Sequence, residues 1–596
     1  MASFLPANKS EYGRNHPRQI EITRKIGLML AVDLRPFNMV DNVGFRDLVR
    51  ALDPRYRIPS RPVFSESVIP SLYHEVKRNL KADLATTVGG ISFTTDMWRS
   101  GQHTEYMCVT LHWIVFDEQN NEMQQRSALV SIEEFPEAAT ANNIRQRLEE
   151  VFSEWCGEVG RGKDCVIIFG VSDNGANVKK ALLDAADEGK IFGWVSCFAH
   201  NLNLTVQHAV KTQRNVADGL TILRKVVSKV LNSTPIKRRF EELQRLHYPG
   251  RRQHLHLHPD VPTRWNSVLT MLESILPQRL AVEALIQDRV MQSHHNIVLP
   301  HVFNYWTDVC DAMEELVKIL RPFHEATLIC SQEKSTLSSY VPTSKGLSVS
   351  VTGAPAEGVG STKDLLLNGL NKITADRILR EGNCHVYFAA TLLDPRYKKK
   401  FVPRERLDGV IASLVEAAVF MAKDDEIGQQ NEEGDLSDTQ QYPRDDFQPD
   451  DPVRDFSDDE AHEVHDDDVA VESQASLMAS IVAAATDDDD DGTADRAQML
   501  SVKERVNAEL TSYINEPAME TTASTQAVLK YWQQSRQSFP ILSRIAMSYL
   551  ACPMSSVSSE RMFSLAGNIL TKKRCAMKSG NLNKLAVIKV NRHYLQ

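Results

Sequence analysis

The run DCVIIFGVSDN, from Asp164 to Asn174, constrains the fold most strongly because it is almost continuously apolar. Such a run is typical of a parallel strand that is buried on both faces. Three segments rich in β-branched and aromatic residues precede it: VGGISFTTDMW, YMCVTLHWIVF and SALVSIEEF. Helix and strand patterns then alternate through GANVKKALLDAADEG, GWVSCFA and HNLNLTVQHAVK. This order predicts an α/β fold with a mixed sheet and helices on both faces.

Two of the predicted strands finish on an aspartate. Asp96 ends the first strand and Asp173 ends the apolar run. Ligand sites in open α/β sheets lie at the carboxyl ends of strands, and a divalent cation lets two carboxylates lie close together. A third acid, Glu560, begins a predicted helix after a run of serines that are N-cap candidates. Each acid also has a simpler interpretation, as a turn residue or as a charge that favours the helix dipole.

One acidic segment makes the net charge of the chain negative, although the rest of the chain is net positive. The formal net charge of the 596 residues is −10, but residues 424–495 hold 26 acidic residues and 2 arginines. The rest has 66 basic and 52 acidic residues, a charge of +14. That charge is compatible with nucleic-acid binding, or it is simply spread over a large surface. The acidic segment is expected to be a disordered linker, with mimicry of nucleic acid or contact with chromatin proteins as alternatives.

The composition disfavours several other classes of protein. No apolar run reaches the roughly 18 residues that a membrane helix needs. The polar N-terminus lacks a signal-peptide core. We therefore expect an intracellular protein with no membrane partner. The nine cysteines are scattered without a CxxC pair, so free thiols are expected and zinc is not.

The chain divides into six predicted regions. Residues 1–17 are expected to be a disordered tail, and 18–87 a helical region. The first part of the sheet unit spans 88–212, and long helices occupy 213–423. In this helical region the stretch SYVPTSKGLSVSVTGAPAEGVGST is expected to be a loop. The acidic linker spans 424–497, and helices resume in 498–596.

Six motifs, in this order, resemble the transposases of the hAT superfamily and their host-adopted BED-finger (ZBED-like) relatives: TTDMW, SDNGANV, CFAHNLNL, DVPTRWNS, LLDPRYK and SSERMFS. The resemblance covers roughly residues 18–596. It implies an RNase H-like (retroviral integrase-like) core that a large α-helical insertion interrupts and a C-terminal dimerisation region completes. It also implies a DDE triad, which falls on Asp96, Asp173 and Glu560 and would bind Mg²⁺.

The resemblance assigns roles to five further residues. Arg264 and Trp265 match a pair whose indole stacks on a base flipped out of the DNA, with a core tryptophan as the alternative. Trp98 shares the strand face of Asp96 and matches a tryptophan near the active site, where it is expected to contact DNA, although packing explains it equally well. Cys197 and His200 match a CxxH motif. Two ligands do not make a zinc site, so a structural pair near the active site is expected.

The most apolar part of the C-terminal region begins at Tyr531 and Trp532 and continues through FPILSRIAMSYL. Surplus apolar surface meets either a core or a partner. The resemblance implies both, with Ile541 and Met547 as the residues at which to test a dimer contact. Core packing alone is the alternative.

Two functions remain open from the sequence. The first is a nuclear, DNA-binding, transposase-like protein that forms a homodimer or higher homo-oligomer and, if its chemistry is retained, cleaves and transfers DNA strands with Mg²⁺. The second is a domesticated transcription or chromatin regulator that binds DNA and dimerises without catalysis. The intact triad favours the first. The BED finger of the relatives has no counterpart in this sequence, which favours the second.

Overall fold

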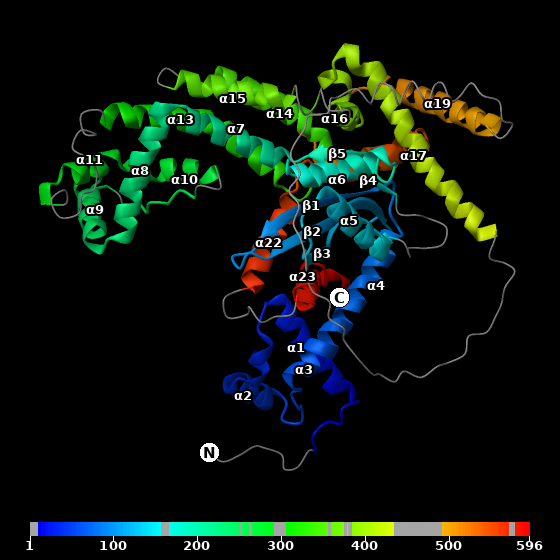
Figure 1. Ribbon diagram of the computed structural model, residues 1–596, viewed down its shortest axis with the longest axis horizontal. Coiled ribbons are helices and arrows are strands. Elements are labelled where there is room, and N and C mark those ends of the chain that lie inside the picture. The colour runs from blue at the N-terminus through cyan, green and yellow to red at the C-terminus, as the bar shows by residue number, and fades with distance from the viewer. Residues whose placement is uncertain are drawn as a thin grey trace, which may run out of the picture.

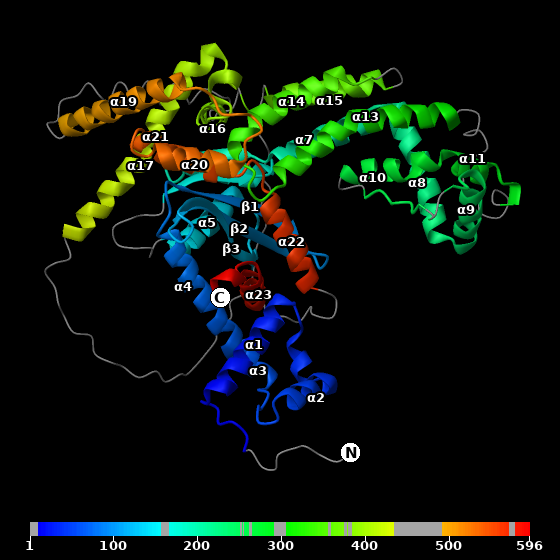
Figure 2. The same ribbon diagram turned by 180° about the vertical axis from the view of Figure 1, so that it is seen from behind.

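A central sheet organises the molecule, as Figure 1 shows. The computed structural model describes residues 10–156, 166–250, 253, 255–261, 265–290, 306–355, 359–374, 378, 384–433, 492–570 and 579–595. Helices α7 to α15 extend from the sheet as an elongated arm, and the first helices of the chain project in another direction (Figures 1 and 2). The C-terminal helices return to the sheet, so distant segments of the chain build one unit.

The sheet has five strands in the order β3-β2-β1-β4-β5. Their bounds are β1 (Ile91–Arg99), β2 (Glu105–Asp117), β3 (Glu122–Glu134), β4 (Ile167–Ser172) and β5 (Gly193–Ser196). The first three strands pair antiparallel, whereas β4 pairs parallel with both β1 and β5. All six residues of β4 are buried, as its apolar run predicts. The predicted mixed sheet is confirmed.

Helices cover both faces of the sheet. One face carries α5 (Ala141–Cys156) and α6 (Ala176–Asp187), and the other carries α21 (Pro540–Ala551) and α22 (Val557–Ile569). Phe93 of β1 contacts Phe152 of α5, with 4.8 Å between ring centroids. Gly170 of the neighbouring strand β4 leaves room for the Phe93 ring, because a Cβ atom at position 170 would lie 2.6 Å from that ring. On the opposite face, the N–H of Gly90 donates to Ser548 of α21 at 2.7 Å.

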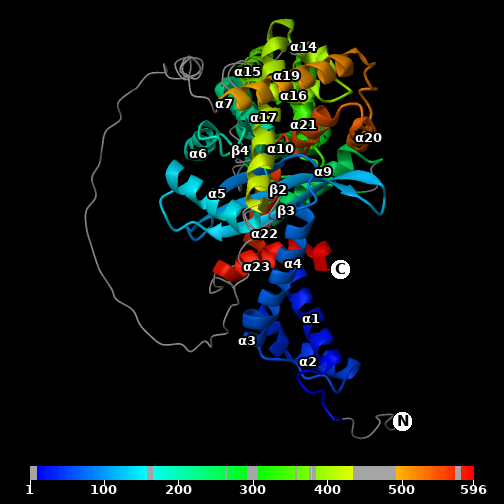
Figure 3. The ribbon, with the colours of Figure 1, turned by 90° about the vertical axis from the view of Figure 1, so that its right-hand side faces the viewer.

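The N-terminal helices form a small unit below the sheet in Figure 3. They are α1 (Pro17–Val32), η1 (Phe37–Asp41), α2 (Val43–Leu52), α3 (Arg61–Val63), η2 (Phe64–Val68) and α4 (Ile69–Leu84). The expected disordered tail is wrong for residues 10–16. The N–H of Tyr12 donates to the carbonyl of Arg55 at 2.9 Å, and the Arg55 guanidinium donates to the Tyr12 hydroxyl at 2.6 Å. The aromatic ring gives this otherwise polar tail a surface to pack with. Residues 1–9 lie outside the described residues.

The helical arm and the helices that follow it occupy the middle of the chain. They are α7 (Phe198–Thr212), α8 (Arg214–Asn232), α9 (Thr234–His247), α10 (Asn266–Ile275), η3 (Leu276–Gln278), α11 (Arg279–Gln287), α13 (Trp306–Cys330), η5 (Leu337–Ser339), α14 (Tyr340–Gly353), α15 (Gly360–Lys372), α16 (Cys384–Leu392), η7 (Lys398–Phe401), η8 (Arg404–Arg406) and α17 (Leu407–Glu433). Among the described helices, none is long and apolar enough to span a bilayer.

The loop predicted around residue 345 is wrong, because most of it forms α14. Tyr340, Ser344, Leu347 and Val351 recur at a helical spacing and are all buried. Tertiary burial of this stripe therefore outweighs the low helix propensity of the glycines and β-branched residues.

Most of the acidic segment, residues 434–491, lies outside the described residues, so its disorder stays a prediction. Its edges differ from the expected boundaries. Residues 424–433 continue α17, which ends before Gly434, and residues 492–497 belong to α19 (Gly492–Asn515). The helices on both sides thus extend into the acidic sequence beyond the expected boundaries.

The motif LLDPRYK joins the arm to the C-terminal region through buried polar contacts. Asp394 is fully buried and accepts hydrogen bonds from Arg396 Nη2 at 2.6 Å, from Arg396 Nε at 2.9 Å and from the Ser338 hydroxyl at 2.7 Å. Lys398 donates to the carbonyl of Tyr513 near the end of α19 at 2.6 Å. This network therefore satisfies both a buried charge and carbonyls at the end of a helix.

The remaining C-terminal elements are α20 (Thr525–Ser535), α23 (Ser579–Val590) and η10 (Arg592–Leu595). Trp532 is fully buried, Met547 is 1% exposed, and Ile541 packs half-buried against the same core. This part of the chain therefore has the core packing that was the alternative to a dimer contact. A charge at Met547 would unfold the core rather than report on a partner.

Candidate active site at the sheet edge

The parallel pairing of β1 with β4 brings two acids to one edge of the sheet. Thr94 is level with Val171 in the ladder. Asp96 and Asp173 each lie two residues further along, so they come level at the carboxyl ends of the strands. The N–H of Gly175 donates to the Asp173 carboxylate at 2.9 Å, which fixes the turn into α6. The structure thus places both predicted aspartates where α/β sheets bind ligands.

Helix α22 brings the third acid to the same edge. Thr94 Oγ1 lies 2.6 Å from Ser559 Oγ, and the Trp98 ring stacks on Phe563 with 5.7 Å between centroids. Asp96 lies between Thr94 and Trp98 on that face, because alternate residues of a strand share a face. Glu560 directly follows Ser559, so the helix presents it beside Asp96.

The three carboxyl groups interact electrostatically. Burial raises the pKa of Asp96 well above its usual range, and the charges of Asp173 and Glu560 raise it further. The N–H of Met97 donates to Asp96 at 2.9 Å and opposes this shift. The three acids differ in solvent exposure: Asp96 is 9% exposed, Asp173 is half-buried and Glu560 is exposed. A raised pKa among converging acids is typical of functional sites.

The donor set fits a divalent cation in its chemistry. Mg²⁺ prefers carboxylate oxygens, and a cation would relieve the repulsion at Asp96. Within the described residues, however, no group of three or more His, Cys, Asp or Glu side chains is close enough together to hold a metal ion. The three acids are therefore neighbours that would have to draw together around a cation. Glu560, being exposed, has the most freedom to move.

Cys197 connects the start of α22 to the sheet through hydrogen bonds. The N–H of Ser556 donates to Cys197 Sγ at 3.3 Å, and the N–H of Cys197 donates to the carbonyl of Ser172 at 2.8 Å. Burial raises the pKa of Cys197 to about 11, so its thiol is neutral at pH 7. A hydrogen bond with the backbone of His200, in the first turn of α7, partly opposes that rise. Both residues thus take part in packing beside the acids.

The two tryptophans expected to contact DNA lie in packed surroundings. Trp265 is 4% exposed and makes edge contacts with Phe323 and His324 of α13. In this conformation its indole belongs to the core of the arm and does not offer a face to a base. Arg264 lies outside the described residues. Trp98 is half-buried against α22. Each tryptophan therefore has the packing role that was its alternative.

Several hydroxyl-bearing residues near the acids were missed by the sequence analysis. Thr94 Oγ1 lies 2.6 Å from Thr110 Oγ1, which in turn lies 2.9 Å from His112 Nε2. Burial lowers the pKa of His112 to about 4, so the ring is neutral at pH 7. The run of serines does not cap α22 as expected. Ser556 at the N-cap makes no side-chain cap bond, whereas Ser559 points to the sheet. The sequence did contain a signal for these residues: Thr94 and Asp96, and likewise Thr110 and His112, are two positions apart and so share a strand face.

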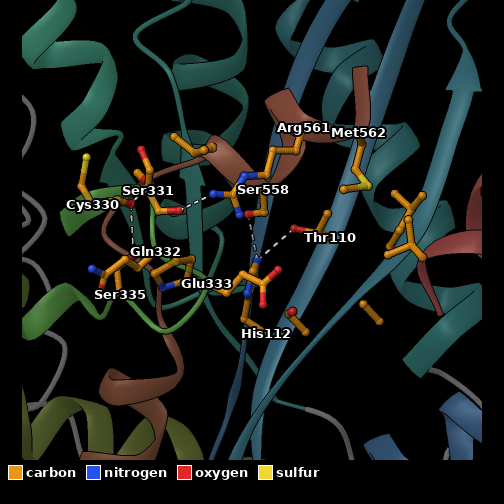
Figure 4. A pocket seen from close by; sticks show the side chains of 17 residues that line it. Thr110, His112, Cys330, Ser331, Gln332, Glu333, Ser335, Ser558, Arg561 and Met562 are labelled. Atoms are coloured by element: carbon orange, nitrogen blue, oxygen red, sulfur yellow. Dashed lines mark hydrogen bonds between the residues drawn. The ribbon is translucent and has the colours of Figure 1, made fainter. Parts of the chain in front are cut away.

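A pocket opens on the other side of α22 (Figure 4). Ser558, Arg561 and Met562 line it from the helix, and Thr110 and His112 line it from β2. Helical spacing turns these three helix residues away from the side that carries Glu560. The pocket therefore reaches the Thr110–His112 end of the hydroxyl-bearing chain, while the acids lie at the other end.

Comparison with protein families agrees with this arrangement. The profile of the ZBED1 RNase-like domain matches residues 94–184, which include Asp96 and Asp173. The ZBED1 RNase-like helical domain matches residues 195–309. The hAT family C-terminal dimerisation region matches residues 509–591, which include Glu560. The sheet with its helices thus fits an RNase H-like fold.

Similar proteins share the same ancestry along nearly the whole chain. The human zinc finger BED domain-containing protein 4 is 28% identical over 595 residues, which cover 99% of this chain and 45% of that protein. The mouse zinc finger BED domain-containing protein 6 is 24% identical over 96% of this chain and 55% of its own length. The putative AC transposase of Zea mays is 23% identical over 92% of this chain and 62% of its own length. The chain thus spans about half the length of the curated relatives it matches. Along nearly its whole length the chain is therefore similar to ZBED-like proteins and hAT transposases.

Proposed function

We propose that this protein binds DNA in the nucleus and cleaves and transfers DNA strands in a Mg²⁺-dependent reaction. The observation that carries the proposal is the electrostatic convergence of Asp96, Asp173 and Glu560 at one edge of the sheet. A folded protein gains nothing in stability from three acids in this position. A site that binds cations and phosphates explains why they are there.

Each acid has a distinct part in the proposed site. Asp96 and Asp173, held by adjacent strands, would hold Mg²⁺, and Glu560 would complete the ligand set from α22. Bound Mg²⁺ supplies Lewis-acid activation of an attacking hydroxyl and neutralises charge at the phosphate. Asp96 is buried and fixes its position, whereas the exposure of Glu560 leaves that side of the site open to a strand of DNA.

The positive charge of the chain outside the acidic segment and the match to a dimerisation region both support DNA as the substrate. Outside the acidic segment the chain carries +14, which favours contact with the phosphate backbone. The match to a dimerisation region supports a homo-oligomer, and two linked subunits would hold two DNA ends together. The acidic segment would contact basic chromatin proteins or compete with DNA for the basic surface.

A nicking assay on supercoiled plasmid with Mg²⁺ tests the proposed chemistry. Asp96→Asn, Asp173→Asn and Glu560→Gln should each lower the cleavage rate by about a thousandfold or more, since such acids act as one unit. Asp187→Asn, at the exposed end of α6, is the matched control and should cleave like the wild type.

The outcome separates the two candidate functions. Binding of DNA without cleavage by the wild-type protein would favour the non-catalytic regulator. Cleavage that survives all three substitutions would exclude this site as its source.

A further inference from the structure

We infer that the buried chain of hydroxyl groups formed by Thr110, Thr94 and Ser559 positions Glu560 for the metal site. The inference rests on the proposed function and deepens it, because it names residues that act through Glu560 rather than on the substrate. Thr94, Thr110 and Ser559 are therefore positioning residues.

The hydroxyl groups form a continuous and buried row. Thr94 Oγ1 lies 2.6 Å from both Thr110 Oγ1 and Ser559 Oγ, and Thr110 continues to His112 Nε2 at 2.9 Å. Each of these four residues is at most 3% exposed. Buried hydroxyl groups at such short distances fix one another, because a broken link would leave an unpaired polar atom away from water. Figure 4 shows the Thr110–His112 end of this chain beside the pocket.

The short bonds can all be satisfied with a single direction of donation. Ser558 Oγ lies further away, 3.4 Å from Thr94 Oγ1 and 3.5 Å from His112 Nε2. His112 is neutral, so its Nε2 either donates to Thr110 or accepts from it. Each hydroxyl then donates once and accepts once, in either direction, as far as Ser559. The Ser559 hydroxyl also partly opposes the burial-raised pKa of the Cys108 thiol, and Cys108 is paired with Asp96 in the ladder between β1 and β2. The chain thus ends directly beside the buried acid.

Helix α22 depends on such contacts because its own cap is weak. Ser556 provides no side-chain cap bond, so the first turn must be held by the rest of the protein. Ser559 lies in that turn, immediately before Glu560. The Trp98–Phe563 stack holds the next turn. Thr94 and Trp98 flank Asp96 on its strand, so these two attachments set the level at which the helix presents Glu560.

An isosteric pair of variants tests the positioning role. Thr94→Val removes the hydroxyl and keeps the shape, whereas Thr94→Ser keeps the hydroxyl. We expect Thr94→Val to weaken Mn²⁺ binding by about 10- to 100-fold, the usual cost of losing a group that orients a metal ligand. Thr94→Ser should stay within about threefold of the wild type. Free Mn²⁺ is measured by electron paramagnetic resonance, at a temperature where each variant is folded.

Plasmid cleavage gives a second measurement that simple loss of packing would not reproduce. Thr94→Val should lower the cleavage rate at saturating DNA and leave the DNA concentration for half-maximal rate unchanged. Thr110→Val and Thr110→Ser repeat the comparison one link further away. They decide the question if Thr94→Val does not fold.

The results distinguish this inference from the function on which it rests. If the wild type and Asp96→Asn bind Mn²⁺ equally, or neither binds it, both the proposed function and the positioning role are overturned. If Asp96→Asn loses Mn²⁺ but Thr94→Val and Thr110→Val bind it as the wild type does, the positioning role alone is overturned. Equal losses in the Val and Ser variants would also overturn it, because the hydroxyl would not be the group that matters.

Discussion

Two buried aspartates in this protein have opposite surroundings. Asp394 is fully buried and receives two side-chain hydrogen bonds from Arg396 and one from Ser338. Asp96 is nearly as buried, but its charged neighbours are the carboxylates of Asp173 and Glu560. Both residues lie in motifs that resemble those of hAT transposases, so the motifs alone do not distinguish their roles. Their partners do.

The different partners of Asp394 and Asp96 indicate different roles for the two residues. A buried acid that is paired with a guanidinium contributes to one defined packing arrangement, here between the arm and the C-terminal region. A buried acid that faces further acids makes the protein less stable until a cation arrives. We therefore interpret Asp394 as a structural residue and propose that Asp96 is a site residue, whose destabilising position is tolerated because of the cation it would bind.

The largest expected effect comes from breaking the paired side of this comparison. Arg396→Ala leaves the Asp394 charge buried without its cation, which should lower the free energy of unfolding by about 3–5 kcal/mol. Denaturant unfolding measures this loss. Arg404→Ala, at an exposed position nearby, should change it by no more than about 0.5 kcal/mol. Similar values for the two variants would remove the distinction.

A third buried titratable group, His112, sharpens the comparison through pH. Its folded pKa of about 4 lies below the usual value, so its contribution to stability is complete above pH 6.5 and is lost as the pH falls towards 4. The loss should reach about 3 kcal/mol. His112→Asn should flatten the decline of the unfolding free energy over this range. His103→Asn, at an exposed turn, should leave the decline intact.

The smallest effect has the opposite sign and concerns Asp96 itself. Its folded pKa is raised, so the metal-free protein loses stability as the pH rises from the ordinary value of a carboxyl group through the folded pKa. Asp96→Asn removes that loss and should raise the free energy of unfolding by about 1 kcal/mol at pH 8 without metal. Asp394→Asn should lower it. A loss of stability in both variants would mean that Asp96 is not held against like charges.

The sequence predicted the sheet because its strongest signal is local. The continuous burial of β4 and the alternation around it fix a mixed sheet, and the resemblance then assigns the three acids. Contacts between distant segments were beyond such signals. The stripe that makes α14 a helix acts only through tertiary burial, and Trp265 packs on α13 although its motif suggested stacking on DNA. The hydrogen bond between Thr94 and Ser559 joins residues far apart in the chain, so no local periodicity of the sequence predicts it.

Proton release on metal binding shows whether Asp96, Asp173 and Glu560 bind a cation. Burial and two neighbouring carboxylates raise the pKa of Asp96 in the metal-free protein, so a cation that binds there at a pH below this raised pKa displaces protons from the acid cluster. Isothermal titration with Mn²⁺ in two buffers of different ionisation enthalpy measures the number released. We predict saturable binding with proton release in the wild type, and loss of both in Asp96→Asn. No binding by the wild type, or unchanged binding and proton release in Asp96→Asn, would contradict it.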